Sequence, residues 1–198
     1  MTELSSRWPL GADLAEVRDA LLSAYATDRG YHDSRHLTEV LDRVDELAAG
    51  GEGFDRPAVE LAAWFHDGVY DGRDGAEERS AQWALDALAG LPVAEEVARL
   101  VRLTERHAPA DDDANGCALS DADLAILAAA PERYAEYTAD VRREYAHVPD
   151  DLFRVGRVAV LSDLLAKPTL FHTAHARRQW EARARANGEA ELGQIAAG

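Results

Sequence analysis

The sequence predicts an all-α protein, and three observations indicate this fold class. Apolar residues recur at helical spacing along almost all of the 198 residues. Pro131, Pro149 and Pro168 separate the later apolar stretches. No stretch shows the alternation typical of a β-strand, and no internal repeat is present. We therefore expect a bundle of about eight or nine helices that forms one domain over residues 1–198.

The first half of the chain predicts five helices. Leu14, Val17, Leu21 and Leu22 fall on one face of a helix over 12–26, and Asp33-Ser34 supplies a cap for the next. That second helix carries Leu37 to Leu47 and ends at the glycines of 50–53. Pro57 suits the first turn of a third helix, which runs to Phe65. After a loop at 71–75, helices follow at 76–89 and 93–106.

The second half predicts an acidic loop followed by four helices. Residues 108–117, which include Asp111-Asp112-Asp113, are expected to form an exposed loop. The expected helices cover 121–129, 131–146, 150–166 and 173–187.

Charge and composition exclude several classes of partner. The formal net charge is −16, so the chain lacks the basic surface that a nucleic-acid polymer or an anionic membrane needs. No apolar run is long enough to span a membrane, and no signal-peptide pattern opens the sequence. The single cysteine, Cys117, rules out an internal disulfide. We expect a cytoplasmic protein, and a small anionic substrate fits only if the site carries its own positive charge.

The stretch AAWFHDGVYD indicates a buried polar site. An apolar run leads into His66 and Asp67, with Asp71 one helical turn later. Burying an imidazole beside a carboxylate is unfavourable unless both groups are satisfied. His36 on the preceding helix, and Asp121 or Asp123 further along, supply more groups of the same kind. Imidazole and carboxylate together are good ligands for divalent transition metals.

Six blocks of the sequence occur in a characteristic order: Tyr31-His32 with His36, Trp64 to Asp67 with Val69-Tyr70-Asp71, Glu77 with Ser80-Ala81, Thr104 with His107, Asp121 to Leu127, and Arg142 with Glu144-Tyr145. In this order the chain resembles the HD-domain superfamily of metal-dependent phosphohydrolases. Within it, the chain is similar to a subgroup of predicted phosphohydrolases whose substrate is unassigned. The resemblance covers roughly residues 12–192, the expected core of an HD-type helical bundle.

The resemblance implies a metal centre with His36, His66, Asp67 and one carboxylate of Asp121-Ala122-Asp123 as ligands. The two-metal branch of the superfamily has two further histidines before the last aspartate, and here that interval holds only His107. We therefore expect one divalent ion, with Mn, Fe, Co, Ni, Mg and Zn left open. The implied reaction is attack of a metal-activated water on a phosphate ester or anhydride of a small molecule such as a nucleotide.

The same resemblance suggests roles for other side chains. Asp67, Glu77, Asp71 and His107 are candidates to orient the water or to protonate the leaving group. Arg142, Tyr31 and His32 are candidates to bind the phosphorylated substrate. These are the catalytic and substrate-binding residues that we expect.

Each candidate also has a structural interpretation. Asp71 could close a turn, Glu77 could pair with Arg73 or Arg79, and His107 could form a structural hydrogen bond. Arg142, Glu144 and Tyr145 could form a structural network, and His32 with His36 could form a local zinc face.

The choice between Asp121 and Asp123 follows from helix geometry. The two residues diverge by about 200° around a helix, so both cannot face one ion. Asp123 borders the apolar face marked by Leu124 and Leu127, whereas Asp121 stands at the expected start of the helix, where a carboxylate caps free amides. The resemblance also favours the aspartate directly before Leu124. We therefore assign ligation to Asp123 and capping to Asp121.

Two other functions compete with hydrolysis. One is a ligand-binding or regulatory protein of the same fold with a structural metal and no turnover. The other is oxidation at a di-iron site, which the small number of histidines disfavours. The sequence leaves open whether several copies of the chain assemble.

Overall fold

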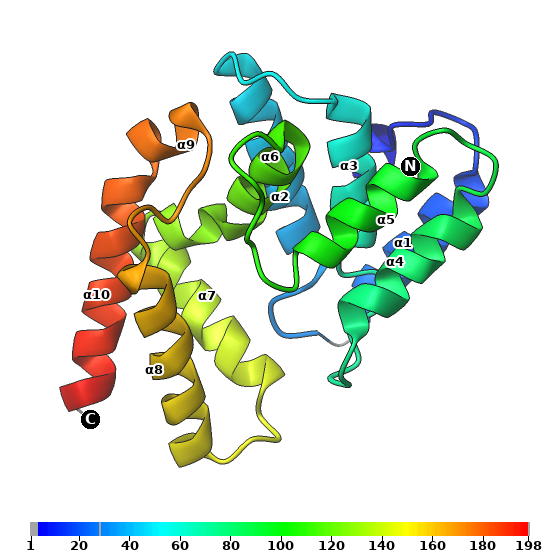
Figure 1. Ribbon diagram of the computed structural model, residues 1–198. Helices are drawn as coiled ribbons and strands as arrows, with labels where there is room; N and C mark the ends of the chain where they lie inside the picture. Colours follow the sequence, from blue (N-terminus) through cyan, green and yellow to red (C-terminus); the bar gives the residue numbers. More distant parts are fainter. Residues whose placement is uncertain (1–3, 28, 198) are drawn as a thin grey trace.

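The computed structural model describes residues 4–27 and 29–197, and this part of the chain is helical with no strand (Figure 1). It contains ten α-helices and two short 3-10 helices, which confirms the all-α class predicted from the sequence. Residues 1–3, 28 and 198 of the expected domain lie outside the described part. None of the described helices is both long and apolar enough to cross a membrane.

The helices follow one another with short connections. Their bounds are η1 Leu4–Arg7, α1 Ala15–Tyr25, α2 Ser34–Ala49, α3 Arg56–Phe65, α4 Ala76–Ala87, α5 Ala94–Leu103, α6 Ala114–Leu124, η2 Ala125–Ala128, α7 Pro131–Glu144, α8 Asp150–Ala166, α9 Ala174–Gln179 and α10 Glu181–Ala197.

Aspartate caps set where the central helices begin. The Asp33 side chain accepts hydrogen bonds from the amides of Arg35 and His36 at the start of α2. Asp55 accepts from the amide of Ala58 at the start of α3, where Pro57 occupies the first turn. These caps fix the position at which each helix enters the core, and therefore which side chains face inward.

α6 begins earlier than the sequence predicts. Its first residue is Ala114, and Asp113 caps it by accepting a hydrogen bond from Gly116 N. The expected loop at 108–117 therefore ends in a helical turn, and the expected helix at 121–129 is the end of α6 followed by η2. The burial of Cys117 and Leu119 explains the difference, because packing of these residues outweighs the low helix propensity of Asn115-Gly116.

The expected helix at 173–187 is two helices. α9 ends at Gln179 and α10 begins at Glu181, and the latter continues to Ala197. Trp180 lies at the break, where its indole N–H donates to Glu46 of α2 over 3.0 Å. This long-range bond and the edge-to-face contact with Phe171 hold the Trp180 ring in the core.

α2, α3 and α6 form the centre of the molecule, with α4 and α5 on one side and α7, α8 and α10 on the other (Figure 1). α3 is the most deeply buried of the three, since Leu61 to Phe65 are all 1 % exposed or less. Trp64 packs edge-to-face on Trp8, with ring centroids 5.2 Å apart. The apolar surface buried here, at about 25 cal/mol per Å², is what stabilises the central helices.

The connection between α1 and α2 lies directly against α7. The carbonyl oxygen of Gly30 accepts a hydrogen bond of 2.9 Å from Arg143. A β-carbon at position 30 would overlap the backbone of Asp140 and of Glu144. This close approach places Tyr31 and His32 beside α7.

We expect Gly30→Ala to lower the free energy of unfolding by about 1–3 kcal/mol, because the added methyl group must displace α7 backbone. Urea denaturation measures the change. Gly53→Ala is the matched control, because a β-carbon at position 53 meets open space. Equal stability of the two variants would show that α7 does not pack against Gly30.

Candidate metal centre

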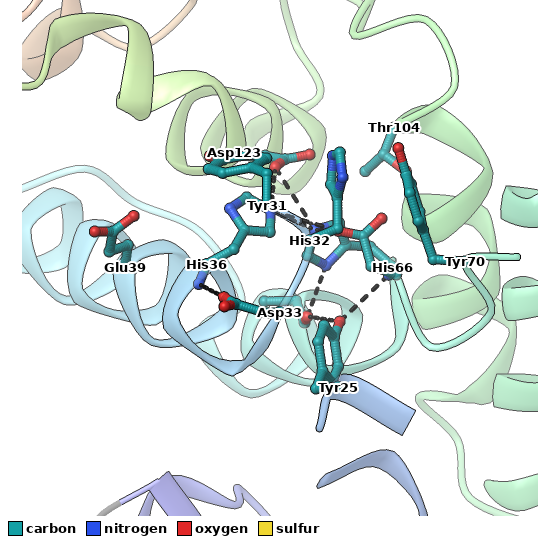
Figure 2. A network of polar contacts seen from close by, with 12 residues as sticks. Tyr25, Tyr31, His32, Asp33, His36, Glu39, His66, Tyr70, Thr104 and Asp123 are labelled. Carbon is teal, nitrogen blue, oxygen red and sulfur yellow. Dashed lines mark hydrogen bonds and ion pairs between the residues drawn. The ribbon is translucent and has the colours of Figure 1, made fainter. Parts of the chain in front are cut away.

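Four side chains from three central helices meet at one point. His36 comes from α2 and Asp123 from α6, and His66 and Asp67 directly follow α3. Figure 2 shows His36, His66 and Asp123 lying close together. The Nε2 atoms of His36 and His66 are 3.2 Å apart, and Asp123 Oδ1 lies 3.1 Å from His36 Nε2. Asp67 Oδ2 lies 3.0 Å from His66 Nε2 and 3.4 Å from His36 Nε2.

The backbone around Asp67 is held by two long-range contacts. Its amide donates to the Tyr25 hydroxyl over 3.3 Å, and its carbonyl oxygen accepts a hydrogen bond of 2.7 Å from Arg29. Figure 2 shows Tyr25 beneath the cluster. α1 and the following connection therefore position a residue at the end of α3.

Local hydrogen bonding fixes the tautomer of His66. Its Nδ1 atom lies 2.7 Å from the carbonyl oxygen of Ala63, which can only accept. Nδ1 must therefore carry a proton, and Nε2 presents a lone pair to His36 and Asp67 when the ring is neutral. A backbone carbonyl behind the ring is the arrangement common among metal-ligating histidines.

One carboxylate oxygen in the cluster lacks a hydrogen-bond donor. Asp67 Oδ2 is buried and forms no hydrogen bond with any described residue. Leaving such an oxygen unsatisfied is costly. Donors bound at about 2.1 Å to a tetrahedral or octahedral ion stand about 3.0–3.4 Å apart, which matches the spacing of these atoms. His36, His66 and Asp67 could therefore hold a metal ion.

The cluster also attracts positive charge. Burial lowers the pKa of His36, but the carboxylates of Asp123 and Asp67 outweigh burial and raise it to about 9. Burial raises the pKa of Asp67, but the nearby imidazoles, His66 first, hold it well below its ordinary value. The pKa of Asp123 is likewise held well below its ordinary value, with His66 the largest of the charges that lower it against burial. Both carboxylates are therefore ionised, and either protons on the imidazoles or a divalent metal ion must balance their two negative charges.

Asp121 and Asp123 point to different parts of the molecule. Asp121 is fully buried, and its two carboxylate oxygens accept hydrogen bonds from the amides of His172 and Thr173 over 2.8 and 2.7 Å. The expectation that Asp121 caps its own helix is wrong, because α6 starts at Ala114. Asp121 instead holds the segment before α9, and the structure brings only Asp123 of this pair to the cluster.

His107 lies next to the cluster without joining it. Its Nε2 atom is 3.6 Å from Asp123 Oδ2, and its Nδ1 atom is 3.3 Å from the Ser120 hydroxyl. The backbone of His107 has a positive φ of 47°, a conformation that residues other than glycine rarely adopt. Burial lowers the pKa of this imidazole, so it is neutral at pH 7.

A cavity of about 530 Å³ opens over the cluster. This volume is within the range of small-molecule sites. Of the residues predicted from the sequence, Tyr31, His32, Glu77 and His107 line it together with His66, Asp67 and Asp123. Leu124, Leu127, Val160 and Leu164 give it an apolar wall, and charged residues from the α5–α6 connection and from α8 complete it.

His32 is held by α7 rather than by the cluster. Its Nδ1 atom lies 2.5 Å from Glu144 Oε1, while Glu144 Oε2 accepts hydrogen bonds from the amides of Tyr31 and His32 over 2.9 and 3.1 Å. The ring of Tyr70 stacks on His32 with centroids 4.1 Å apart. Glu144 therefore has the structural role considered from the sequence, and it positions two cavity-lining residues.

Two predicted site residues lie elsewhere. Arg142 donates to the carbonyl oxygens of Tyr145 and Val148 over 2.6 and 3.0 Å and pairs with Asp150, and it does not line the cavity. Asp71 forms a two-bond ion pair with Arg79 at 2.7 and 2.8 Å, outside the cavity. These contacts match the structural interpretations considered from the sequence. Arg142 binds carbonyl oxygens that follow the end of α7, and Asp71 closes a turn by accepting a hydrogen bond from the amide of Arg73.

The cavity also contains residues that were not predicted from the sequence, among them Tyr137, Arg157 and Lys167. Arg157 pairs with Glu191 at 2.6 and 2.9 Å and donates to the Tyr137 hydroxyl over 3.0 Å. Helical periodicity carries no information on these long-range partners. The only feature of the sequence that sets one of these residues apart is that Lys167 is the single lysine in the chain.

No family model, curated protein or solved structure matches this chain. The resemblance to the HD-domain superfamily therefore stays a prediction from the sequence motifs.

We expect Asp123→Ala to lose bound metal and Asp121→Ala to retain it, because only Asp123 reaches the cluster. Asp121→Ala should instead lower the free energy of unfolding by about 2–3 kcal/mol, because the amides of His172 and Thr173 lose the side chain that accepts their hydrogen bonds. Metal analysis and urea denaturation of each variant measure these effects. Metal loss in Asp121→Ala together with full metal in Asp123→Ala would reverse the assignment.

A second expectation concerns pH. Burial raises the pKa of Glu144, but the hydrogen bond from His32 leads a set of contacts that lower it from 4.5 to about 2. Because the pKa of Glu144 is lower in the folded protein than in the unfolded chain, the ionised Glu144 carboxylate stabilises the fold above about pH 4.5. This contribution to the free energy of unfolding is lost as the pH falls toward 2. Glu144→Gln should therefore be less stable than the native protein at pH 7, by about 1–3 kcal/mol, and this gap should narrow toward pH 2.

Urea denaturation between pH 2 and pH 7 measures the gap. Glu136→Gln on the same helix is the control, since its carboxylate forms an exposed ion pair with Arg35. A gap for Glu144→Gln that does not vary with pH would contradict the assignment.

Proposed function

We propose that this protein is a metal-dependent phosphohydrolase that cleaves a phosphate ester or anhydride of a small molecule. The observation that carries the proposal is the buried Asp67 Oδ2 atom, which has no hydrogen-bond donor among the described residues. This oxygen lies 3.0 and 3.4 Å from the Nε2 atoms of His66 and His36. Asp67 and His66 also line the cavity. The sequence resemblance to the HD-domain superfamily supports the same reaction class. Fold-level analogy does not identify the substrate.

In this proposal His36, His66, Asp67 and Asp123 hold one divalent ion. The ion supplies Lewis acidity, which acidifies water and polarises a phosphoryl oxygen. The carbonyl of Ala63 keeps the proton of His66 on Nδ1, so that Nε2 is available for ligation.

His107 is suited to hold or pass a proton at Nε2. Its imidazole is neutral at pH 7, lies 3.6 Å from Asp123 and lines the cavity. Ser120 orients the ring from the Nδ1 side. Glu77 provides a second proton acceptor on the cavity wall.

Tyr31 is suited to bind a substrate oxygen. Its hydroxyl is buried, has no hydrogen-bond partner among the described residues, and belongs to a side chain that lines the cavity. Burial raises the pKa of Tyr31 well above its ordinary value, so the hydroxyl remains a donor at neutral pH. A phosphate oxygen in the cavity would satisfy it.

We expect the metal-loaded protein to hydrolyse small phosphate esters and to lose this activity on chelation. Asp67→Ala should lower kcat/KM by about a hundredfold or more, because the ion loses a ligand. Circular dichroism should show an unchanged helical fold, since Asp67 lies after α3 and the helix is held by its buried apolar residues. Asp86→Ala, an exposed position on α4, is the control.

Other outcomes discriminate among the competing functions. One bound ion without turnover on any ester or anhydride would favour a ligand-binding protein. Two bound irons with oxygen-dependent chemistry would favour oxidation. Full activity of Asp67→Ala would reject the mechanism.

A further inference from the structure

The cavity over the candidate metal centre is lined by three cations that differ in what neutralises them. Arg157 is 9 % exposed at its side chain and is fully engaged by Glu191 and Tyr137. Arg106 is exposed to solvent. Lys167 is half-buried, and no carboxylate of residues 4–27 or 29–197 forms an ion pair with it. Even Asp163, one turn earlier on α8, lines the same cavity without pairing with Lys167.

The backbone of Lys167 is fixed although its side chain is unpaired. Its amide donates to Leu164 over 3.1 Å at the end of α8, and its carbonyl oxygen accepts a hydrogen bond of 2.8 Å from Arg185. Arg185 also donates to the carbonyl oxygen of Leu165 over 3.0 Å. α10 therefore holds the end of α8 in place and directs a lysine to the cavity wall.

Lys167 and His107 line the same cavity. Burial lowers the pKa of His107, Asp123 opposes this shift, and the positive charges of His66 and Lys167 add to it. His107 in turn lies 3.6 Å from Asp123. The Lys167 side chain lines the cavity without a carboxylate partner among the described residues, so its charge is available to an anion bound in the cavity.

We propose that Lys167 binds the phosphoryl group of the substrate, and that the substrate is a phosphomonoester with an apolar body rather than a polyphosphate. This inference rests on the proposed function. In the proposed site one divalent ion would neutralise the charges of Asp67 and Asp123. The carboxylate of Glu191 neutralises the charge of Arg157. Among the described lining residues, Lys167 is then the one half-buried cation left to bind a ligand.

The rest of the cavity fits the same substrate class. Glu77, Glu105 and Asp163 lie on its walls and would repel further phosphates, as would the net charge of −16. The apolar wall of Leu124, Leu127, Val160 and Leu164 offers a place for the organic part of the molecule.

The sequence makes a direct test available. Lys167 is the only lysine, so reductive methylation with ¹³C-formaldehyde labels Lys167 and the N-terminal amine alone. Zn²⁺ is diamagnetic, and the Zn²⁺-loaded protein can be titrated with inorganic phosphate while the two methyl resonances are followed by NMR. We expect a saturable shift of the Lys167 resonance and no shift of the N-terminal resonance. Zn²⁺ alone, without phosphate, gives the reference spectrum.

Variants provide the second readout. Lys167→Met should weaken phosphate binding and raise KM for a phosphomonoester about tenfold or more, with a smaller change in kcat, as expected for loss of a charge-assisted hydrogen bond. Lys167→Arg should restore most of the affinity. Arg154→Met, an exposed position on α8 outside the cavity lining, removes the same charge and should behave as the native protein.

Each outcome bears on the proposal. A Lys167 resonance that does not move while calorimetry shows phosphate bound, or no phosphate binding at all, overturns it. Tighter binding of a triphosphate than of the corresponding monophosphate overturns the substrate class. A shifted resonance without hydrolysis of any ester supports the role of Lys167 and rejects the proposed function. Hydrolysis with native kinetics in Lys167→Met rejects the role of Lys167 and leaves the proposed function standing.

Discussion

The rest of the structure depends on the burial of two carboxylates and two imidazoles at one point in an apolar bundle. His36, His66, Asp67 and Asp123 are each unfavourable there alone, so α2, α3 and α6 must bring them together in one arrangement. The aspartate caps of these three helices fix where each one begins. Arg29 and Tyr25 then hold the backbone of Asp67, so that even the peripheral α1 contributes to the geometry of the cluster.

α6 connects the cluster to the C-terminal helices. Its two aspartates lie on opposite sides of the helix, and Asp123 joins the cluster while Asp121 binds the amides before α9. One helix therefore contacts both the cluster and the segment that leads into α9. The same C-terminal segment positions α8, because Arg185 of α10 binds the carbonyl oxygens at the end of α8. The C-terminal part of the chain thus contacts both α6, which carries Asp123, and α8, which lines the cavity.

Local signals in the sequence predicted the fold class and most helices, because apolar spacing and capping residues act over a few positions. The apolar run ending in His66-Asp67 marked a buried polar pair. That His36 and Asp123 would join this pair was expected from the resemblance to the HD-domain superfamily, because apolar spacing alone does not show which helices meet. The start of α6 was not predictable, because burial of Leu119 overrides the propensity of Asn115-Gly116. The ion pair of Arg157 with Glu191 and the placement of Lys167 at the cavity wall depend on how α8 and α10 fold back on one another, and periodicity does not encode that.

The chain order of the cluster has a consequence for biosynthesis. All four converging residues lie before Leu124, whereas α8 and α10, which build and brace the far wall of the cavity, follow it. During translation, α2, α3 and α6 leave the ribosome while the last third of the chain is still being made. The four residues of the cluster are therefore all synthesised before the helices that complete the cavity around them.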